Sequence, residues 1–181
     1  MATPSVTFLL ALKIWLEAII SSKGIKAQRP EKGGGILAYS LIAPAVHIGL
    51  IPPGHYLPAD DSIRIPCITI GMMERGDDNE GSSVSLRLTV AIYDPGHQEM
   101  SAMNGLSLAP NFDGYIALLN LLDSLAEAIM SAGKIADNFE LASLVKTSVY
   151  DEQPWPYWYG ALTFTVDGAP YARTDYAEFL L

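Results

Sequence analysis

Large apolar residues recur at every second position between Ser83 and Tyr93, and this is the clearest structural signal in the chain. A period of two is typical of a β-strand with one buried face. We therefore expect a strand here, inside a sheet whose inner face needs an apolar cover. The residues expected on that face are Val84, Leu86, Leu88, Val90 and Ile92.

A second strand is predicted from Ile65 to Met73, just before the first. Between the two, the stretch from Arg75 to Ser82 is rich in glycine, asparagine and acidic residues, which favour turns. The pattern predicts a long hairpin with a charged tip.

Two segments have apolar residues at helical spacing, from Pro4 to Ser22 and from Phe112 to Ser131. The second has one apolar stripe and suits the cover that the hairpin needs. The first is apolar on more than one side, because Leu10 and Ile14 lie off its main stripe. This indicates either a contact with another chain or a helix set deep in its own core.

Three further strands are predicted, from Ala45 to Ile51, from Leu144 to Tyr150 and from Tyr159 to Val166. Gln28 to Gly35 and Pro95 to Asn111 are expected to be irregular connections. The elements predict an α/β (α+β) fold, a twisted and mostly antiparallel sheet with a long hairpin and two helices packed on one face. We expect one domain over residues 1–168, followed by a C-terminal tail over 169–181.

Two proline-rich stretches stand out as candidate contact surfaces. Pro52 to Pro58 predicts a stiff arm or a partner contact, with a linker as the alternative. Asp151 to Tyr159 holds four aromatic residues beside two prolines, which is typical of a recognition surface because little entropy is lost on binding. The alternative is an aromatic plug that closes one end of the core.

The formal net charge of -9 over 181 residues argues against binding nucleic acid by neutralising phosphates. One cysteine, Cys67, cannot form an internal disulfide, and it fits a reducing compartment. The apolar N-terminal segment contains Lys13 and Glu17 and is too short to span a bilayer, so we expect a helix of a soluble protein and no membrane partner.

Residues that carry chemistry are sparse. His47, His55 and His97 show no metal-binding spacing, and neither a phosphate-binding loop nor a nucleophile elbow is present. We therefore expect no catalytic residues, no cofactor and no metal. The competing hypothesis is a small metal- or ligand-binding enzyme that uses His55, His97 and the acidic tip.

The order of these elements, together with the acidic hairpin tip and the Tyr93-Asp94-Pro95 end of the long strand, resembles the tail terminator (tail completion) proteins of long-tailed bacteriophages and phage-like contractile particles. The resemblance covers most of the chain and lies in the topology and the pattern of elements rather than in a motif of invariant residues. The proline arm and the tail after Gly168 depart from a compact member, which leaves a neighbouring head-tail connector or neck ring as the alternative.

The resemblance implies a structural virion protein whose copies form a ring, a hexamer in that family, that caps the tail tube, ends its polymerisation and joins it to the neck or head. The expected partners are further copies, the tail tube protein and a neck or head-completion protein. DNA would pass through without specific binding, at the tail-neck junction of a virion assembled in the bacterial cytoplasm. The residues expected at the contacts with other copies or the tube are Glu74, Arg75, Asp77, Asp78, Glu80, Pro52, Pro53, Tyr56, Trp155, Tyr157 and Trp158.

Overall fold

The computed structural model describes residues 4–31, 38–50, 65–77, 81–101, 105–109, 113–135 and 139–168, with the backbone alone for 97–101 and 105–109. These residues include two helices, α1 (Pro4–Ser22) and α2 (Asp113–Ala132). The strands are β1 (Ala27–Pro30), β2 (Tyr39–Ile42), β3 (Ala45–Ile48), β4 (Cys67–Asp77), β5 (Ser82–Tyr93), β6 (His97–Ser101), β7 (Gly105–Ala109), β8 (Lys134–Ile135), β9 (Phe139–Leu141), β10 (Lys146–Val149) and β11 (Tyr157–Gly168).

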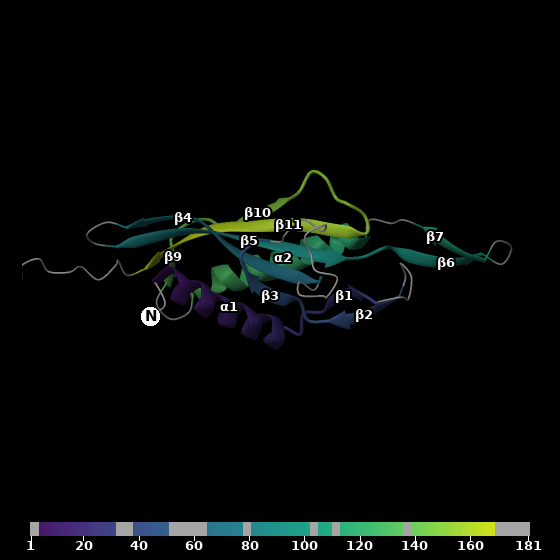
Figure 1. Ribbon diagram of the computed structural model, residues 1–181, viewed down its shortest axis with the longest axis horizontal. Coiled ribbons are helices and arrows are strands. Elements are labelled where there is room, and N and C mark those ends of the chain that lie inside the picture. The colour runs from purple at the N-terminus through teal and green to yellow at the C-terminus, as the bar shows by residue number, and fades with distance from the viewer. Residues whose placement is uncertain are drawn as a thin grey trace, which may run out of the picture.

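One curled sheet forms the body, in the order β3-β4-β5-β11-β9-β8, with β10 also paired to β11 (Figure 1). Its longest ladder joins β5 to β11 from Ser82–Gly168 to Tyr93–Tyr157. Only β3 and β4 run parallel to each other; every other pairing in this sheet is antiparallel. The prediction of a mostly antiparallel sheet is therefore confirmed.

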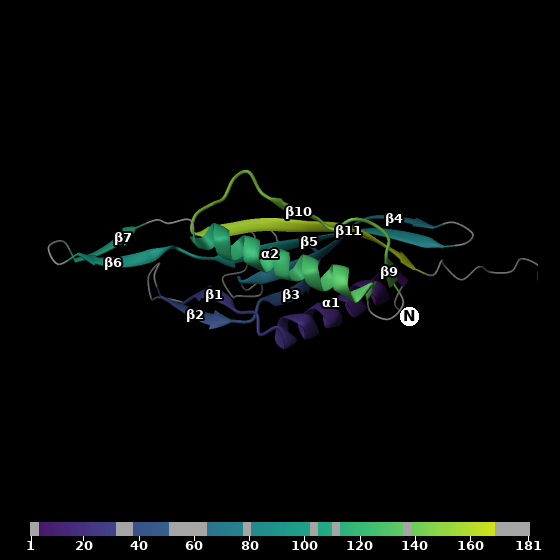
Figure 2. The same cartoon turned by 180° about the vertical axis from the view of Figure 1, so that it is seen from behind.

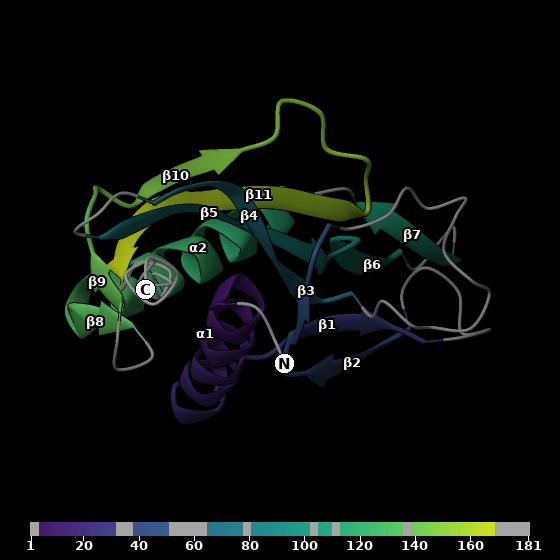
Figure 3. The ribbon, with the colours of Figure 1, turned by 60° about the vertical axis from the view of Figure 1, so that its left-hand side comes forward.

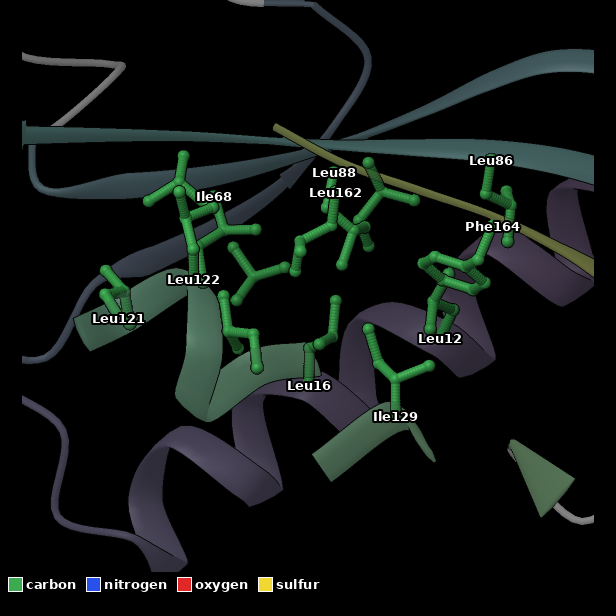
Figure 4. Packing of buried hydrophobic residues seen from close by; sticks show 14 of the residues in the cluster. Leu12, Leu16, Ile68, Leu86, Leu88, Leu121, Leu122, Ile129, Leu162 and Phe164 are labelled. Carbon is green, nitrogen blue, oxygen red and sulfur yellow. The ribbon is translucent and has the colours of Figure 1, made fainter. Parts of the chain in front are cut away.

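Both helices lie on the same side of this sheet (Figures 1 and 3). The apolar rows of β5 and β11 face them, and side chains from both helices join these rows in one buried cluster (Figure 4). Burying a large apolar side chain stabilises a fold by about 1.5–3 kcal/mol, so this cluster is what holds the layers together. Its largest fully buried members include Phe8, Leu12, Leu16, Ile68, Leu86, Leu88, Leu122 and Ile129.

A glycine follows the end of each helix. Gly24 and Gly133, which follow α1 and α2, have φ angles of 62° and 63°. This left-handed conformation is costly for residues with a Cβ atom, so glycine commonly ends a helix.

Two expected connections contain strands instead. The segment from Gln28 begins inside β1, which pairs with β2 from Ala27–Ile42 to Pro30–Tyr39. Within the connection expected between Pro95 and Asn111, β6 and β7 form a second antiparallel ribbon. The prediction of irregular structure was wrong in both places because these strands are short and rich in turn-forming or polar residues, so alternation is weak. Figure 2 shows the β6–β7 ribbon projecting beyond the end of the sheet, on the side opposite the β4–β5 hairpin.

The hairpin itself has a feature that alternation did not predict. The pairing of β4 with β5 shifts between Met72 and Glu74, so Met73 is an extra residue, a β-bulge. Beyond the bulge, Arg75 pairs with Val84, whose side chain is buried on the helix side of the sheet, and Glu74 pairs with Ser85 on the outer face. The bulge therefore reverses which of these two charged residues faces the helices.

Candidate assembly surface

The exposed side of α1 carries a continuous apolar stripe. Val6, Leu10 and Ile14 are spaced four residues apart and are all exposed, Ile14 by 66%. Phe8, Leu12 and Leu16 on the other side of the helix are buried. Of the two interpretations of this helix, the second is wrong, because Leu10 and Ile14 are exposed and not set deep in the protein's own core, and the contact with another chain stays a prediction. An aligned stripe of this kind is a candidate contact surface.

Arg75 anchors the base of the hairpin tip. Its guanidinium donates two hydrogen bonds to the Asp77 carboxylate, from Nε to Oδ2 at 2.8 Å and from Nη2 to Oδ1 at 2.7 Å. Its Nη1 donates a further hydrogen bond to Ser5 Oγ in the first turn of α1, at 3.2 Å. The Arg75 side chain is only 9% exposed. Arg75 and Asp77 were expected at a contact with other chains, and in the protomer they join the tip to α1.

Glu74 lies on the outer face beside an open groove of about 470 Å³. Lys146, at the start of β10, lines the same groove. Exposed Met73 and Leu144 form apolar parts of its wall. Among the described acidic residues of the hairpin tip, Glu74 is therefore the one whose carboxylate a partner could reach on the outer face.

The aromatic segment is divided between core and surface. Trp158 is 7% exposed, and its indole Nε1 donates a hydrogen bond to the Asp94 carbonyl at 3.0 Å. It thus closes one end of the core, which was the alternative role for this segment. Trp155 is 42% exposed and stays available as a contact residue. Tyr157 is half-buried, with its ring centroid 5.3 Å from that of Tyr93.

Tyr150 and Arg87 form a neighbouring cluster on the outer face. The Arg87 guanidinium carbon lies 5.5 Å from the Tyr150 ring centroid, and that ring meets Tyr159 edge-on at 6.4 Å. Arg87 Nε is buried without a hydrogen-bond partner. Cation–π contacts of this kind contribute about 0.5–1 kcal/mol at exposed sites. This cluster therefore holds the loop between β10 and β11 against the sheet.

Five of the expected contact residues lie outside the described residues: Pro52, Pro53, Tyr56, Asp78 and Glu80. His55, of the competing enzyme hypothesis, also lies outside them. His47 is on β3, with its Nε2 atom buried and without a hydrogen-bond partner. Within the described ranges, no group of three or more His, Cys, Asp or Glu side chains is close enough to hold a metal ion.

A second hollow, of about 370 Å³, lies between the β1–β2 ribbon, the end of β5 and α2. Ile92 and Leu121 form part of its apolar lining, and Gln28, Asp94 and Asn120 contribute polar groups. Gln28 Oε1 is buried without a hydrogen-bond partner. Lys26 and Ser124 also line the hollow.

Both helices are long and apolar enough to cross a membrane by length and composition, although core helices of soluble proteins pass the same test. In the structure α2 presents its buried residues to the sheet, where they join the core cluster. The α1 segment from Ser5 to Ser22 is 22% buried, in keeping with its exposed stripe.

Sequence reasoning missed the groove, because it depends on the bulge at Met73 and on Lys146 from a strand far away in the chain. The bulge had one weak signal. The alternation of Ile68 and Ile70 would, if continued, place Glu74 on the buried face, where an unpaired carboxylate is costly.

Together, the fold and these surfaces define an α+β protein with a polar outer sheet face, two helices on the inner face and an exposed apolar stripe on one helix. No protein-family model matches the chain, and a search of curated proteins finds no match.

Proposed function

We propose that this protein is a ring-forming structural protein that terminates the tail tube of a phage or phage-like particle. The observation that carries the assembly part of the proposal is the stripe of Val6, Leu10 and Ile14 on α1. In a closed ring the stripe of each copy would be covered by a different surface of the next copy, so that none of the stripes stays exposed to water. The particular role comes from the order of elements, which resembles that of tail terminators.

Two further features support a ring through which DNA passes. The net charge of -9 gives the subunit a field that repels a polyanion, so the wall would not hold the DNA. The two ends of the molecule also differ, with the β4–β5 hairpin at one end and the β6–β7 ribbon at the other (Figure 2). A subunit with two different ends suits head-to-tail contacts, and such contacts form a ring when the rotation from one copy to the next adds up to a full turn.

The β6–β7 ribbon supports assembly in a second way. Its register places Met100 opposite Leu106 and Gln98 opposite Leu108. Both of its strands pair only with each other, within the part of the chain that the structure describes. A two-stranded ribbon is marginally stable in water by itself, and a neighbouring subunit would provide the missing cover.

The first experiment is the solution mass of the purified protein, alone and mixed with its tail tube protein, by light scattering after gel filtration. A closed oligomer, or a monomer that forms rings only on tube ends, is the expected result. A monomer that does not bind to tail tubes would overturn the proposal. Flotation with liposomes serves as a separate arm, because co-flotation through α1 would identify the stripe as a membrane contact instead.

A further inference from the structure

The hollow between the β1–β2 ribbon, the end of β5 and α2 is built from three elements that lie far apart in the chain. Gln28 and Leu41 are directly paired across the ribbon, so their side chains lie on the same face of it. α2 contributes one side of the helix, with residues at spacings of three and four. The volume of about 370 Å³ is typical of a pocket that holds a small molecule. The α2 residues of the lining are Ala117, Asn120, Leu121 and Ser124.

Asp94 places a buried carboxylate in this hollow. The residue is 9% exposed, and its Oδ1 atom accepts a hydrogen bond from the Gly96 backbone N–H at 2.9 Å. Its own backbone is fixed by hydrogen bonds to the Pro156 carbonyl at 2.9 Å and from the Trp158 indole at 3.0 Å. Among the described residues, the carboxylate has no ion-pair partner. Carboxylates are seldom this buried unless a cation pairs with them, so Asp94 is suited to bind one.

Gln28 adds a second acceptor to the same hollow. Its Oε1 atom is buried and has no hydrogen-bond partner. Ser124 does not supply the donor, because its hydroxyl group donates to the Asn120 carbonyl at 2.8 Å. Buried polar atoms in folded proteins nearly always have a partner. The two acceptors therefore suit an occupant that brings N–H donors.

Most of the remaining lining is apolar. Ile92 and Leu121 are buried members of the core cluster, and Ile25 and Ala27 pack against that cluster. Leu41 is exposed and contributes apolar surface from the ribbon. An occupant of this hollow therefore needs an apolar stem as well as its donors.

Lys26 is the only cation among the described residues of the lining. It is exposed, and it forms no ion pair with Asp94. Its charge at the rim lowers the affinity of the hollow for another cation, whereas the net charge of -9 of the whole chain raises it.

We propose that this hollow binds a small organic cation, with the simplest case a primary ammonium group on an apolar stem. An ammonium group has three N–H donors and no acceptor, so it can donate to both the Asp94 carboxylate and Gln28 Oε1. The stem lies against Ile92 and Leu121. This inference does not rest on the proposed tail function.

A titration of the full chain with hexylammonium, followed by nuclear magnetic resonance, tests the site. The signals to follow are the side-chain amide of Gln28 and the backbone N–H of Gly96, which lie at the two acceptors. The matched probes are hexanol, which has no charge, hexanoate, which has the opposite charge, and methylammonium, which has no stem.

Hexylammonium is expected to shift both signals with a Kd on the order of a millimolar. Each matched probe is expected to bind at least about tenfold more weakly, since it lacks either the charge-assisted hydrogen bonds or the apolar contact. Equal binding of hexanol, or no shift of these two signals with hexylammonium, would overturn the proposal.

Asp94→Asn tests the carboxylate, because it removes the charge but keeps an oxygen acceptor for the Gly96 N–H. It is expected to weaken hexylammonium binding by about tenfold and to leave hexanol binding unchanged. Asp123→Asn is the matched control, with the same loss of charge at an exposed α2 residue outside the lining. The same affinity in both variants would contradict the role of Asp94.

Two further variants are expected to bind more tightly, a result that damage to the fold would not produce. Gln28→Glu adds a second carboxylate to the hollow, and Lys26→Met removes the competing cation from its rim. Each is expected to tighten hexylammonium binding by about threefold. Weaker binding in both, with an unchanged circular dichroism spectrum, would overturn the proposal.

A lysine side chain of another protein carries the same chemistry as a free amine. The peptide Gly-Lys-Gly with blocked ends distinguishes the two sources. Binding at the same two signals with the affinity of hexylammonium would identify a protein side chain as an occupant that fits. Binding of hexylammonium alone would identify a free amine, and in both cases the site is supported.

Discussion

At the scale of single residues, the interior of this protein is specified by close contacts that leave little room for change. Trp158 is the clearest case, because its indole is hydrogen-bonded to the end of β5 and covered by the first turn of α2. Gly114 in that turn is buried, and a Cβ atom there would collide with the Trp158 ring. A glycine is usually unfavourable inside a helix by about 0.5–1 kcal/mol relative to alanine. Here the space for Trp158 outweighs that preference.

Gly114→Ala is therefore expected to destabilise the protein by about 2 kcal/mol, in spite of its better helix propensity. The measurement is the free energy of unfolding from urea titration. In a Trp158→Phe background the same change is expected to cost clearly less, since the smaller ring leaves space for the methyl group. Equal costs in the two backgrounds would show that the collision with Trp158 is not the cause.

Cys67 shows a second residue-scale effect, on pH dependence. Burial raises the pKa of its thiol from 9.0 to about 11. The folded state therefore favours the neutral thiol, and its contribution to stability is complete below pH 9 and is lost as the pH rises toward 11. We expect the free energy of unfolding to fall by roughly 2–3 kcal/mol over this range. In Cys67→Ala the fall is expected to be smaller by that amount, measured by urea titration at pH 8, 9, 10 and 11.

At the scale of elements, the β4–β5 hairpin is attached to α1 through one side chain. Arg75 reaches the first turn of the helix only because the bulge at Met73 turns it toward the helix side of the sheet. The same bulge turns Glu74 outward to the groove. The inserted residue thus directs Arg75 to a contact inside the protomer and Glu74 to the outer surface.

Arg75→Ala is expected to destabilise the protein by about 1–3 kcal/mol, because it removes two charge-assisted hydrogen bonds to the partly buried Asp77 carboxylate. Faster hydrogen exchange should appear in the β4–β5 ladder near the tip. Lys134→Ala is the matched control, since its ion pair with Glu140 is exposed at both side chains. Its effect should stay below about 0.5 kcal/mol. A similar loss in both variants would mean that Arg75 does not anchor the hairpin.

At the scale of the whole molecule, one layer of helices covers one face of a curled sheet, and the far side of α1 carries exposed apolar side chains. The two helices cover the core, but the surface still exposes apolar side chains on α1. The exposed stripe on α1 leaves apolar area in contact with water in a single copy, and the proposed ring would cover it.

Ile14→Glu is expected to abolish the proposed oligomer while the subunit stays folded, because it places a charge in the stripe at an exposed position. Light scattering gives the mass, and circular dichroism checks the fold. Ile116→Glu on α2 is the matched control, with the same substitution at another exposed isoleucine. An unchanged mass in Ile14→Glu would remove the α1 stripe from the interface.

The sequence by itself determined the long elements and the fold class. The helix from Pro4 to Ser22 has these bounds in the structure, and the row from Val84 to Ile92 is buried as alternation predicted. These features depend on the local periodicity of apolar residues, which can be recognised in the sequence without knowing which segments pack against each other. Short strands such as β1, β6 and β8 are only four, five and two residues long, which is too short to show a recognisable periodicity.

Only the tertiary structure decided which side chains are available at the surface. Judged by residue type alone, a contact surface could use Trp158 and Arg75 as well as Trp155 and Glu74. The first two are engaged within the protomer, by Asp94 and Asp77. The other two are exposed. The difference arises from the register at the bulge and from the packing of α2 on β11, and both depend on residues far apart in the chain. Periodicity therefore determined the framework, and three-dimensional packing determined the surface that a partner meets.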